Sequence, residues 1–378
     1  MSAYLGIPRC DSVNIENALA LVLTPSVPLP PMQRKEAAVP TFQTRNFELR
    51  SGAVLADLEI AYESYGEMTA DRDNVILVTH GITSSHHAAG AATLDRRRGW
   101  WSEVIGPERV FNTTRYSIVS SNMLGSSYGS TGPASLDPSS GKPYGAAFPA
   151  ITFEDIVRAQ HLLLQSLGVR QLVAVAGNSI GAFSAFQWAV TFPDFMKGLI
   201  AMDTSPRDLF DTGAGIPDLI ATLSQDPNWN DGDYYAQGGV AEALTALRVN
   251  TLKSYGFEDK LETGPDQPAP ETVMLETARE WAKEFDAHSL ITLMRAWADF
   301  NVEDELNKVR AKVFYVLCDT DELFPASVGQ SVMAKFRSAG VDATYHEVKS
   351  RLGHYATTEE PEKWTYEVEA FLRGLTAH

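Results

Sequence analysis

Gly177, Ser179 and Gly181 form the pattern G-x-S-x-G near the middle of the chain. The flanking residues predict a buried strand over residues 172–176 and a helix over residues 180–191. In a tight strand-to-helix turn, the positions two residues on either side of the serine must lack a Cβ atom. A hydroxyl raised on such a turn can attack a carbonyl carbon, so the pattern predicts Ser179 as a nucleophile. An ordinary glycine-rich turn with an N-cap serine is the alternative.

A serine nucleophile needs a base, and His354 has the position that suits this role. It follows a predicted strand over residues 344–348 and precedes a predicted helix that begins at Pro361. A loop at that point can reach the carboxyl edge of a sheet. His161 and His346 fall inside a predicted helix and a predicted strand, which is typical of packing or surface residues.

The acid that orients the base should follow a strand. Asp319 and Asp321 both follow a predicted buried strand over residues 313–318. The chain order Ser179, Asp321, His354 is the order of Ser-His-Asp triads in α/β-hydrolases. A solvated acidic loop is the alternative, although it explains neither the strand end nor the order.

Two backbone N–H groups are candidates for stabilising the oxyanion that forms when a carbonyl is attacked. Ile180 follows the serine at the start of the predicted helix, and Ile82 lies in the loop after a predicted strand over residues 74–79. In α/β-hydrolases the loop at this place supplies the second donor. For Ile82 the alternative is a simple glycine turn that ends the strand.

The elements that must position these residues are short apolar runs, typical of strands buried on both faces of a parallel sheet. Such runs cover residues 74–79, 116–120, 172–176, 198–202 and 313–318. Helical stretches, notably residues 152–167 and 180–191, separate some of them. This alternation predicts a doubly wound α/β core with a mostly parallel central sheet flanked by helices. Two segments of alternating polarity around Gly52 predict a preceding hairpin.

The alternation stops late in the chain, where helices are predicted without a buried strand between them. These helices cover residues 240–255, 270–284 and 289–300. An insertion of helices between two late strands predicts a cap over the carboxyl edge of the sheet, where such folds bind ligands. We therefore expect an irregular leader over residues 1–40, a core formed by 41–205 and 302–378, and a helical cap over 206–301.

Composition excludes several other classes of protein. The 378 residues carry a formal net charge of −17, so there is no basic surface that would neutralise the phosphates of a nucleic acid. Cys10 and Cys318 are too few for a disulfide framework, and His86 and His87 lack a nearby third ligand, so no metal site is expected. No stretch contains the roughly 20 apolar residues of a membrane span. We expect a cytoplasmic protein without a resident cofactor.

From about Phe47 onward the chain resembles homoserine O-acetyltransferases and their relatives in the α/β-hydrolase superfamily. The segments that carry the resemblance are residues 122–138, 141–145, 148–151, 226–230, 232–235, 285–289 and 321–325. The resemblance implies an α/β-hydrolase fold with an inserted helical cap, and a homodimer formed through that cap. It selects Asp321 rather than Asp319 as the triad acid. It also implies a small-molecule ester or thioester substrate, with acetyl-CoA or another acyl-CoA as candidate co-substrate.

The departures from this family bear on the substrate. The family places an aspartate directly after the triad histidine, where it holds the amino group of homoserine, but this chain has Tyr355. Arg207 corresponds to the arginine that binds the substrate carboxylate. Without a charged partner, a bound ammonium group would be poorly compensated in a mostly apolar pocket. Asp208 and Asp211 are the alternative partners.

We therefore predict serine-dependent acyl transfer through a covalent acyl-enzyme, by an ester hydrolase or an O-acyltransferase that acts on a small non-amino-acid substrate. The alternative is a homoserine O-acetyltransferase that uses acetyl-CoA. A non-catalytic binding protein is a third interpretation. The intact set of Ser179, Asp321 and His354 argues against it, because a binding protein needs none of them.

Overall fold

The computed structural model describes residues 39–91, 98–261, 264 and 267–376. The predicted leader over residues 1–40 lies outside this part of the chain, apart from its last two residues. No helix in the described part is long and apolar enough to cross a lipid bilayer.

An eight-stranded sheet forms the centre of the molecule, in the order β1-β2-β6-β3-β7-β8-β9-β10. β1 and β2 form an antiparallel hairpin, β2 pairs antiparallel with β6, and the remaining neighbours are parallel. The strands are β1 (Thr41–Glu48), β2 (Val54–Tyr65), β3 (Val75–Thr79), β6 (Ser117–Ser121), β7 (Leu172–Asn178), β8 (Met196–Met202), β9 (Lys312–Cys318) and β10 (Ala343–Val348). A separate two-stranded pair consists of β4 (Ile105–Gly106) and β5 (Phe111–Asn112). The predicted α/β-hydrolase fold is confirmed.

Both faces of the sheet are covered, which is why its central strands are apolar along their whole length. In β3, Val75 and Leu77 join one hydrophobic cluster, while Ile76 and Val78 join the cluster on the opposite face. Residues of α1 and α2 complete the first cluster, and residues of α9 complete the second. Side chains that alternate between faces thus anchor each strand in a fixed register.

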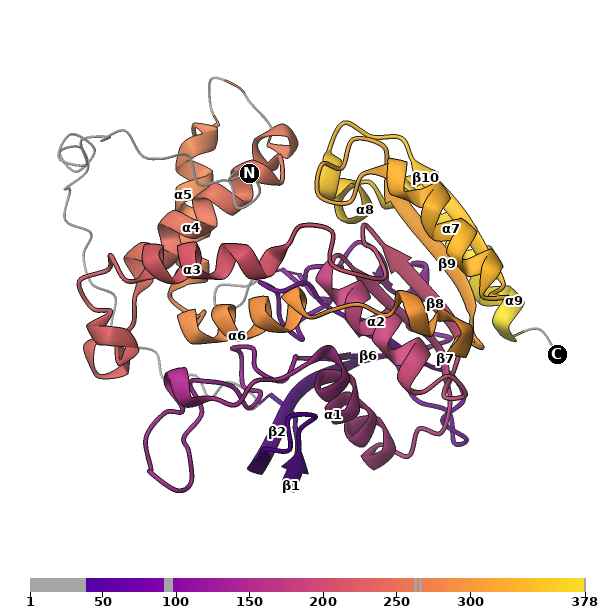
Figure 1. Ribbon diagram of the computed structural model, residues 1–378. Coiled ribbons are helices and arrows are strands. Elements are labelled where there is room, and N and C mark those ends of the chain that lie inside the picture. The colour runs from indigo at the N-terminus through magenta and orange to yellow at the C-terminus, as the bar shows by residue number, and fades with distance from the viewer. Residues whose placement is uncertain (1–38, 92–97, 262–263, 265–266, 377–378) are drawn as a thin grey trace.

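Nine α-helices are assigned in the described residues, and Figure 1 shows that α3 to α6 gather on the side of the molecule away from α7 and α9. They are α1 (Phe153–Ser166), α2 (Ile180–Thr191), α3 (Thr212–Leu223), α4 (Ala241–Ser254), α5 (Pro270–Ala282), α6 (Ala287–Ala298), α7 (Gly329–Ser338), α8 (Ala356–Glu359) and α9 (Thr365–Thr376). Short 3₁₀ turns include η6 (Glu303–Lys308) and η8 (Gly353–Tyr355).

α3 and α7 are not among the helices predicted from the sequence. α3 contains Pro217, which lacks a backbone N–H group, and begins with residues of weak helix propensity. α7 begins at Gly329 and connects β9 with β10, as a parallel sheet requires. In both helices packing against the rest of the fold outweighs weak local propensity.

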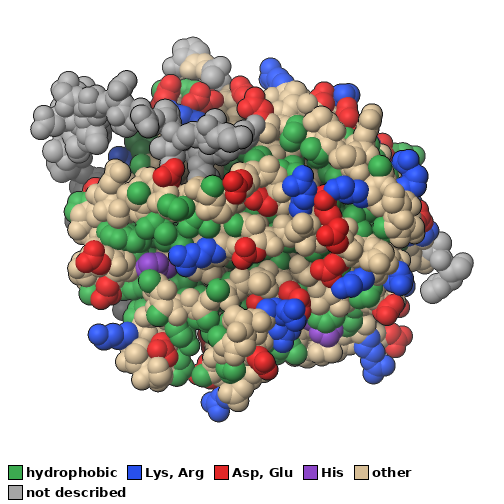
Figure 2. Space-filling model, viewed as in Figure 1, with side chains coloured by type: hydrophobic (Ala, Val, Ile, Leu, Met, Phe, Trp, Pro, Cys, Tyr) green, Lys and Arg blue, Asp and Glu red, His purple; other side chains and the backbone are tan. Residues whose placement is uncertain are grey.

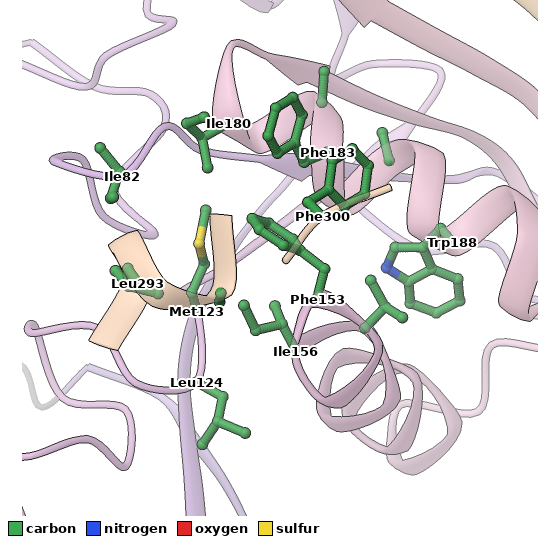
Figure 3. Packing of buried hydrophobic residues seen from close by; sticks show 14 of the residues in the cluster. Ile82, Met123, Leu124, Phe153, Ile156, Ile180, Phe183, Trp188, Leu293 and Phe300 are labelled. Atoms are coloured by element: carbon green, nitrogen blue, oxygen red, sulfur yellow. The ribbon is translucent and has the colours of Figure 1, made fainter. Parts of the chain in front are cut away.

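The segment over residues 206–301 is helical in the structure and carries α3, α4, α5 and α6. Apolar side chains from it, among them Leu293 and Phe300, pack into the same cluster as Phe153 and Phe183 of the core (Figure 3). Treating this segment as a cap subdomain, and as the surface of a homodimer, stays a prediction.

On the face shown in Figure 2, lysines and arginines are interspersed with aspartates and glutamates and form no continuous basic area. This distribution accords with the net charge of −17 and offers no track for a phosphate backbone on that face.

Candidate active site

Ser179 occupies a strained turn between β7 and α2. Its backbone has φ 55° and ψ −130°, a conformation that residues other than glycine rarely adopt. A Cβ atom on Gly177 would lie 2.5 Å from Oγ1 of Thr79, and one on Gly181 would lie 2.2 Å from the carbonyl oxygen of Thr79. The glycines of the G-x-S-x-G pattern are therefore required by the close approach of β3. The backbone of this turn accounts for the sequence pattern.

The structure brings the three predicted triad residues together. Nε2 of His354 lies 2.9 Å from Oγ of Ser179, and Nδ1 of His354 lies 2.8 Å from Oδ2 of Asp321. The other carboxylate oxygen of Asp321 accepts hydrogen bonds from the backbone N–H groups of Leu323 and Phe324. This arrangement can take the proton of the serine hydroxyl and stabilise the imidazolium that results.

The surrounding carboxylates make His354 more basic than an ordinary histidine. Burial alone lowers the pKa of His354, but the carboxylates of Asp321 and Asp203 outweigh it and leave that pKa above its ordinary value. Burial also disfavours the charged form of Asp321, yet His354 and the two backbone donors hold the pKa of Asp321 below its ordinary value. A negative acid beside a readily protonated histidine is the charge distribution that general-base catalysis needs.

Asp319 faces away from this cluster. Its carboxylate accepts a hydrogen bond from the backbone of Ser350 and pairs with Lys349, whose side chain is 71% exposed. Asp319 and Asp321 leave the same strand end but point to different surroundings, and only Asp321 contacts His354 in the described structure.

The two predicted oxyanion donors flank the serine turn. Ile180 is the first residue of α2, and Ile82 lies in the loop after β3; both side chains belong to the buried cluster that Figure 3 shows around Met123. Buried His80 holds this loop, because its Nε2 accepts a hydrogen bond from the backbone N–H of Met123 and its Nδ1 donates to the carbonyl of Gly81. Burial lowers the pKa of His80 to about 4, so it is neutral and keeps this pattern. The donor roles of Ile82 and Ile180 stay predictions.

Arg207 and Tyr355, the predicted substrate contacts, lie in different settings. The guanidinium of Arg207 is half exposed, pairs with Glu303 of η6 and donates to the carbonyl of Asp208. Asp208 in turn accepts hydrogen bonds from Trp297 and from the start of α3. Arg207 and Asp208 thus bond to residues near α3. These contacts give no support to Arg207 as the partner of a substrate carboxylate or to Asp208 as the partner of an ammonium group. Asp211, at the N-terminus of α3, is exposed.

Tyr355 follows His354 directly and is part of an aromatic wall. Its ring lies 6.0 Å from the ring of Tyr255 and 6.1 Å from that of Phe257, while Nζ of Lys260 lies 4.4 Å above it. Burial raises the pKa of Tyr355 above its ordinary value, so its hydroxyl is neutral near pH 7. Tyr355 therefore offers shape and a hydroxyl group at this position, without a negative charge.

Sequence reasoning missed Arg248, a cation of α4 that reaches this area. Its Nη1 donates to the hydroxyl of Thr83, the residue after Ile82, and its guanidinium lies 5.4 Å from the ring centre of Trp281. Its Nε is buried without an acceptor among the described residues. Arg248 and Tyr255 are seven residues apart and share one helix face, a spacing that could have indicated a joint role.

Asp203, at the end of β8, is a second residue that the sequence did not indicate. It is fully buried and has a left-handed φ of 46°. One carboxyl oxygen accepts hydrogen bonds from the side chains of Asn178 and Thr357. Burial, together with the nearby charge of Asp321, raises the pKa of Asp203 well above its ordinary value.

Comparison with known proteins places this site in a family. Residues 74–361 match the family model described as the alpha/beta hydrolase fold. The homoserine O-acetyltransferase of Methanohalophilus mahii is 35% identical over 350 residues, which cover 87% of this chain and 71% of that protein.

Solved structures agree with this assignment. Esterase E22 is 28% identical with a TM-score of 0.79, and the match covers 89% of this chain and 99% of that chain. The homoserine O-acetyltransferase of Bacillus anthracis is 25% identical with a TM-score of 0.79, covering 89% and 97%. The chain is thus an enzyme of the homoserine O-acetyltransferase-like family of the α/β-hydrolase superfamily, a family of acyltransferases and esterases.

Proposed function

We propose that this enzyme transfers an acyl group through a covalent intermediate on Ser179. The observation that carries the proposal is the 2.9 Å contact between Oγ of Ser179 and Nε2 of His354 within a strained turn. His354 takes the hydroxyl proton as Oγ bonds to the carbonyl carbon, then gives it to the departing alcohol or thiol. Asp321 keeps Nδ1 of His354 protonated and stabilises its cationic form. The backbone N–H groups of Ile82 and Ile180 stabilise the oxyanion.

The first candidate reaction is acetyl transfer from acetyl-CoA to the hydroxyl of L-homoserine. It was the alternative in our sequence analysis, and the names of the curated relatives favour it over hydrolysis. Arg248 supports an acceptor that carries a carboxylate, because its buried Nε lacks an acceptor in the described structure. A buried donor of this kind is normally paired, and a substrate carboxylate would pair it with a charge-assisted hydrogen bond.

The second candidate is hydrolysis of small esters, the main prediction from the sequence. Tyr355 favours it, since this residue gives the ammonium group of homoserine no charged partner. Similarity to esterase E22 points in the same direction. In this case water, activated by His354, attacks the acyl-enzyme in place of an alcohol.

One pair of assays separates the two candidates. Thiol release from acetyl-CoA is measured with and without L-homoserine, and hydrolysis of 4-nitrophenyl acetate is measured in parallel. Saturable homoserine-dependent release identifies the transferase, whereas ester hydrolysis without such release identifies the hydrolase. Ser179→Ala is the control for both assays, and a fully active Ser179→Ala enzyme would refute the acyl-enzyme itself.

A further inference from the structure

Three side chains from separate parts of the chain form a closed hydrogen-bonded triangle beneath the serine turn. Nδ2 of Asn178 donates to Oδ2 of Asp203 at 3.0 Å and to Oγ1 of Thr357 at 2.7 Å. The hydroxyl of Thr357 donates to the same oxygen of Asp203. Asp203 and Thr357 are fully buried. A buried polar cluster of this kind is costly unless its geometry is needed.

Each corner of the triangle adjoins a segment that carries the proposed chemistry. Asn178 precedes Ser179, and Thr357 lies three residues after His354. Asp203 directly follows β8, the strand next to β9, which leads to Asp321. The backbone N–H of Ser179 adds a further link to β8 through a 2.9 Å hydrogen bond to the carbonyl of Met202. The triangle therefore ties the serine turn, the histidine loop and the strand end to one another.

Asp203 is also an ionisable neighbour of the triad: burial and the charge of Asp321 raise its pKa to about 7, so its carboxylate is mostly charged only above that pH. Burial lowers the pKa of His354, and Asp203 is one of the two carboxylates that oppose this effect, the other being Asp321. The other titratable side chains that interact with Asp203 electrostatically are Tyr315 and Cys318 of β9. Its Oδ1 has no hydrogen-bond partner among the described residues. Half of this carboxyl group is thus held by the triangle, while its charge acts on His354.

We propose that Asp203 is a second acidic positioning residue of the catalytic centre, which clamps the Ser179 turn to the His354 loop through Asn178 and Thr357 and adds negative charge beside His354. The inference rests on the proposed roles of Ser179 and His354. It assigns the histidine two carboxylates: Asp321 fixes its tautomer by direct contact, and Asp203 acts from the neighbouring strand. When Ser179 loses its proton above about pH 7, where Asp203 is mostly ionised, both carboxylates stabilise the imidazolium.

The charge of Asp203 can be removed while the triangle is kept. In Asp203→Asn the amide oxygen still accepts from Asn178 and Thr357. Without the carboxylate the pKa of His354 falls, and the acid limb of kcat/KM, which requires neutral His354, moves to lower pH. We expect a shift of about half to one pH unit and a fall in kcat of about tenfold, with KM little changed.

The clamp can be weakened while the charge is kept. Thr357→Val is nearly isosteric and removes the hydroxyl that joins the His354 loop to Asn178 and Asp203. We expect kcat to fall severalfold without a shift of the acid limb to lower pH. Asp319→Asn is the matched control, because its carboxylate lies at the same sheet edge but bonds to Ser350, Cys318 and Lys349 and to no member of the triad or the triangle. It should leave both kcat and the pH profile unchanged.

The test is the pH dependence of 4-nitrophenyl acetate hydrolysis by wild type, Asp203→Asn, Thr357→Val, Asp319→Asn and Ser179→Ala, with circular dichroism to verify folding. An acid limb that moves down in Asp203→Asn alone supports the proposal. An Asp203→Asn enzyme whose acid limb stays at the wild-type pH overturns it, whatever its kcat. An active Ser179→Ala enzyme would instead show that the proposed function has failed, so the two failures are distinguishable.

Discussion

The strand ends of the core and the helical segment over residues 206–301 contribute to the site in different ways. In the core, Ser179, Asp321 and His354 each sit one to six residues beyond a strand end, and the backbone fixes their positions. In the helical segment, Arg248 of α4 and Tyr255, the residue that follows α4, reach the same place only through long side chains. We propose that the core supplies the reactive groups and that the helices supply the surroundings that select a substrate.

This difference has a physical cause. A parallel sheet brings its carboxyl ends together whatever the side chains are, so the chemistry at that edge tolerates change elsewhere. Helix packing depends on each side chain, so one substitution can change where a charged side chain of a helix points. We therefore expect reaction type to be set by the core and substrate choice by the helices. The predictions below test this division.

The largest effect should come from the nucleophile. Ser179→Ala removes the atom that bonds to the acyl group, so turnover should fall by several orders of magnitude, about 10⁴- to 10⁶-fold, because triad members act as a unit. The fold should be unchanged, since alanine also has a Cβ atom. Turnover of ester and thioester substrates measures the effect. A loss confined to one substrate class would contradict the idea that the core sets the reaction for all of them.

The acid should come next. Asp321→Asn places an amide against Nδ1 of His354 and favours the wrong tautomer, which costs about 10⁴-fold in kcat in serine proteases. Asp319→Asn should change kcat less than about twofold, since surface ion pairs contribute little. Steady-state kinetics of the two variants provide the comparison. If Asp319→Asn proved the more damaging change, the geometry at the end of β9 would have no bearing on catalysis.

The core was predictable from the sequence because its steric constraints leave local sequence patterns. Thr79 leaves no room for a Cβ at Gly177 or Gly181, so the steric requirement is visible as a pattern of glycines. The strands around Ser179 and before Asp321 are apolar on both faces, which marks them without any knowledge of tertiary structure. Pattern and chain order together therefore indicated the residues that the fold brings into contact.

The missed residues depend on packing that no local pattern records. Asp203 follows a strand as Asp321 does, but its role depends on contacts with Asn178 and Thr357, which are distant in sequence. Arg248 lies within a helix whose orientation the sequence does not give. Arg207 was chosen by resemblance, and its pairing with Glu303 follows from the position of η6. Long-range contacts decide these roles.

Substitutions of Arg248 and Arg207 test whether residues of the helical segment select the substrate. Arg248→Ala should raise KM for a carboxylate-bearing substrate by about 30-fold to several-thousand-fold, equivalent to about 2–5 kcal/mol for an unpaired buried charge. Arg207→Ala should have little effect, because Arg207 is half exposed and paired with Glu303. An uncharged ester such as 4-nitrophenyl acetate serves as the internal control. The reverse ranking of the two variants would restore Arg207 as the substrate contact.

The smallest expected effect concerns Tyr355, where the helical wall meets the histidine loop. Tyr355→Asp would place a carboxylate beside His354, where it could hold the ammonium group of homoserine. We expect the ratio of homoserine-dependent thiol release to ester hydrolysis to rise by about tenfold, equivalent to about 1.4 kcal/mol. Lys260, which lies over the Tyr355 ring, limits the gain because it can pair with the new carboxylate. Tyr355→Asn is the matched control, since asparagine has the same size without the charge. An equal rise in both variants would mean that the tyrosine ring, rather than a missing charge, restricts homoserine. If neither variant changes the ratio, substrate choice does not depend on position 355, and other residues must determine which substrate is used.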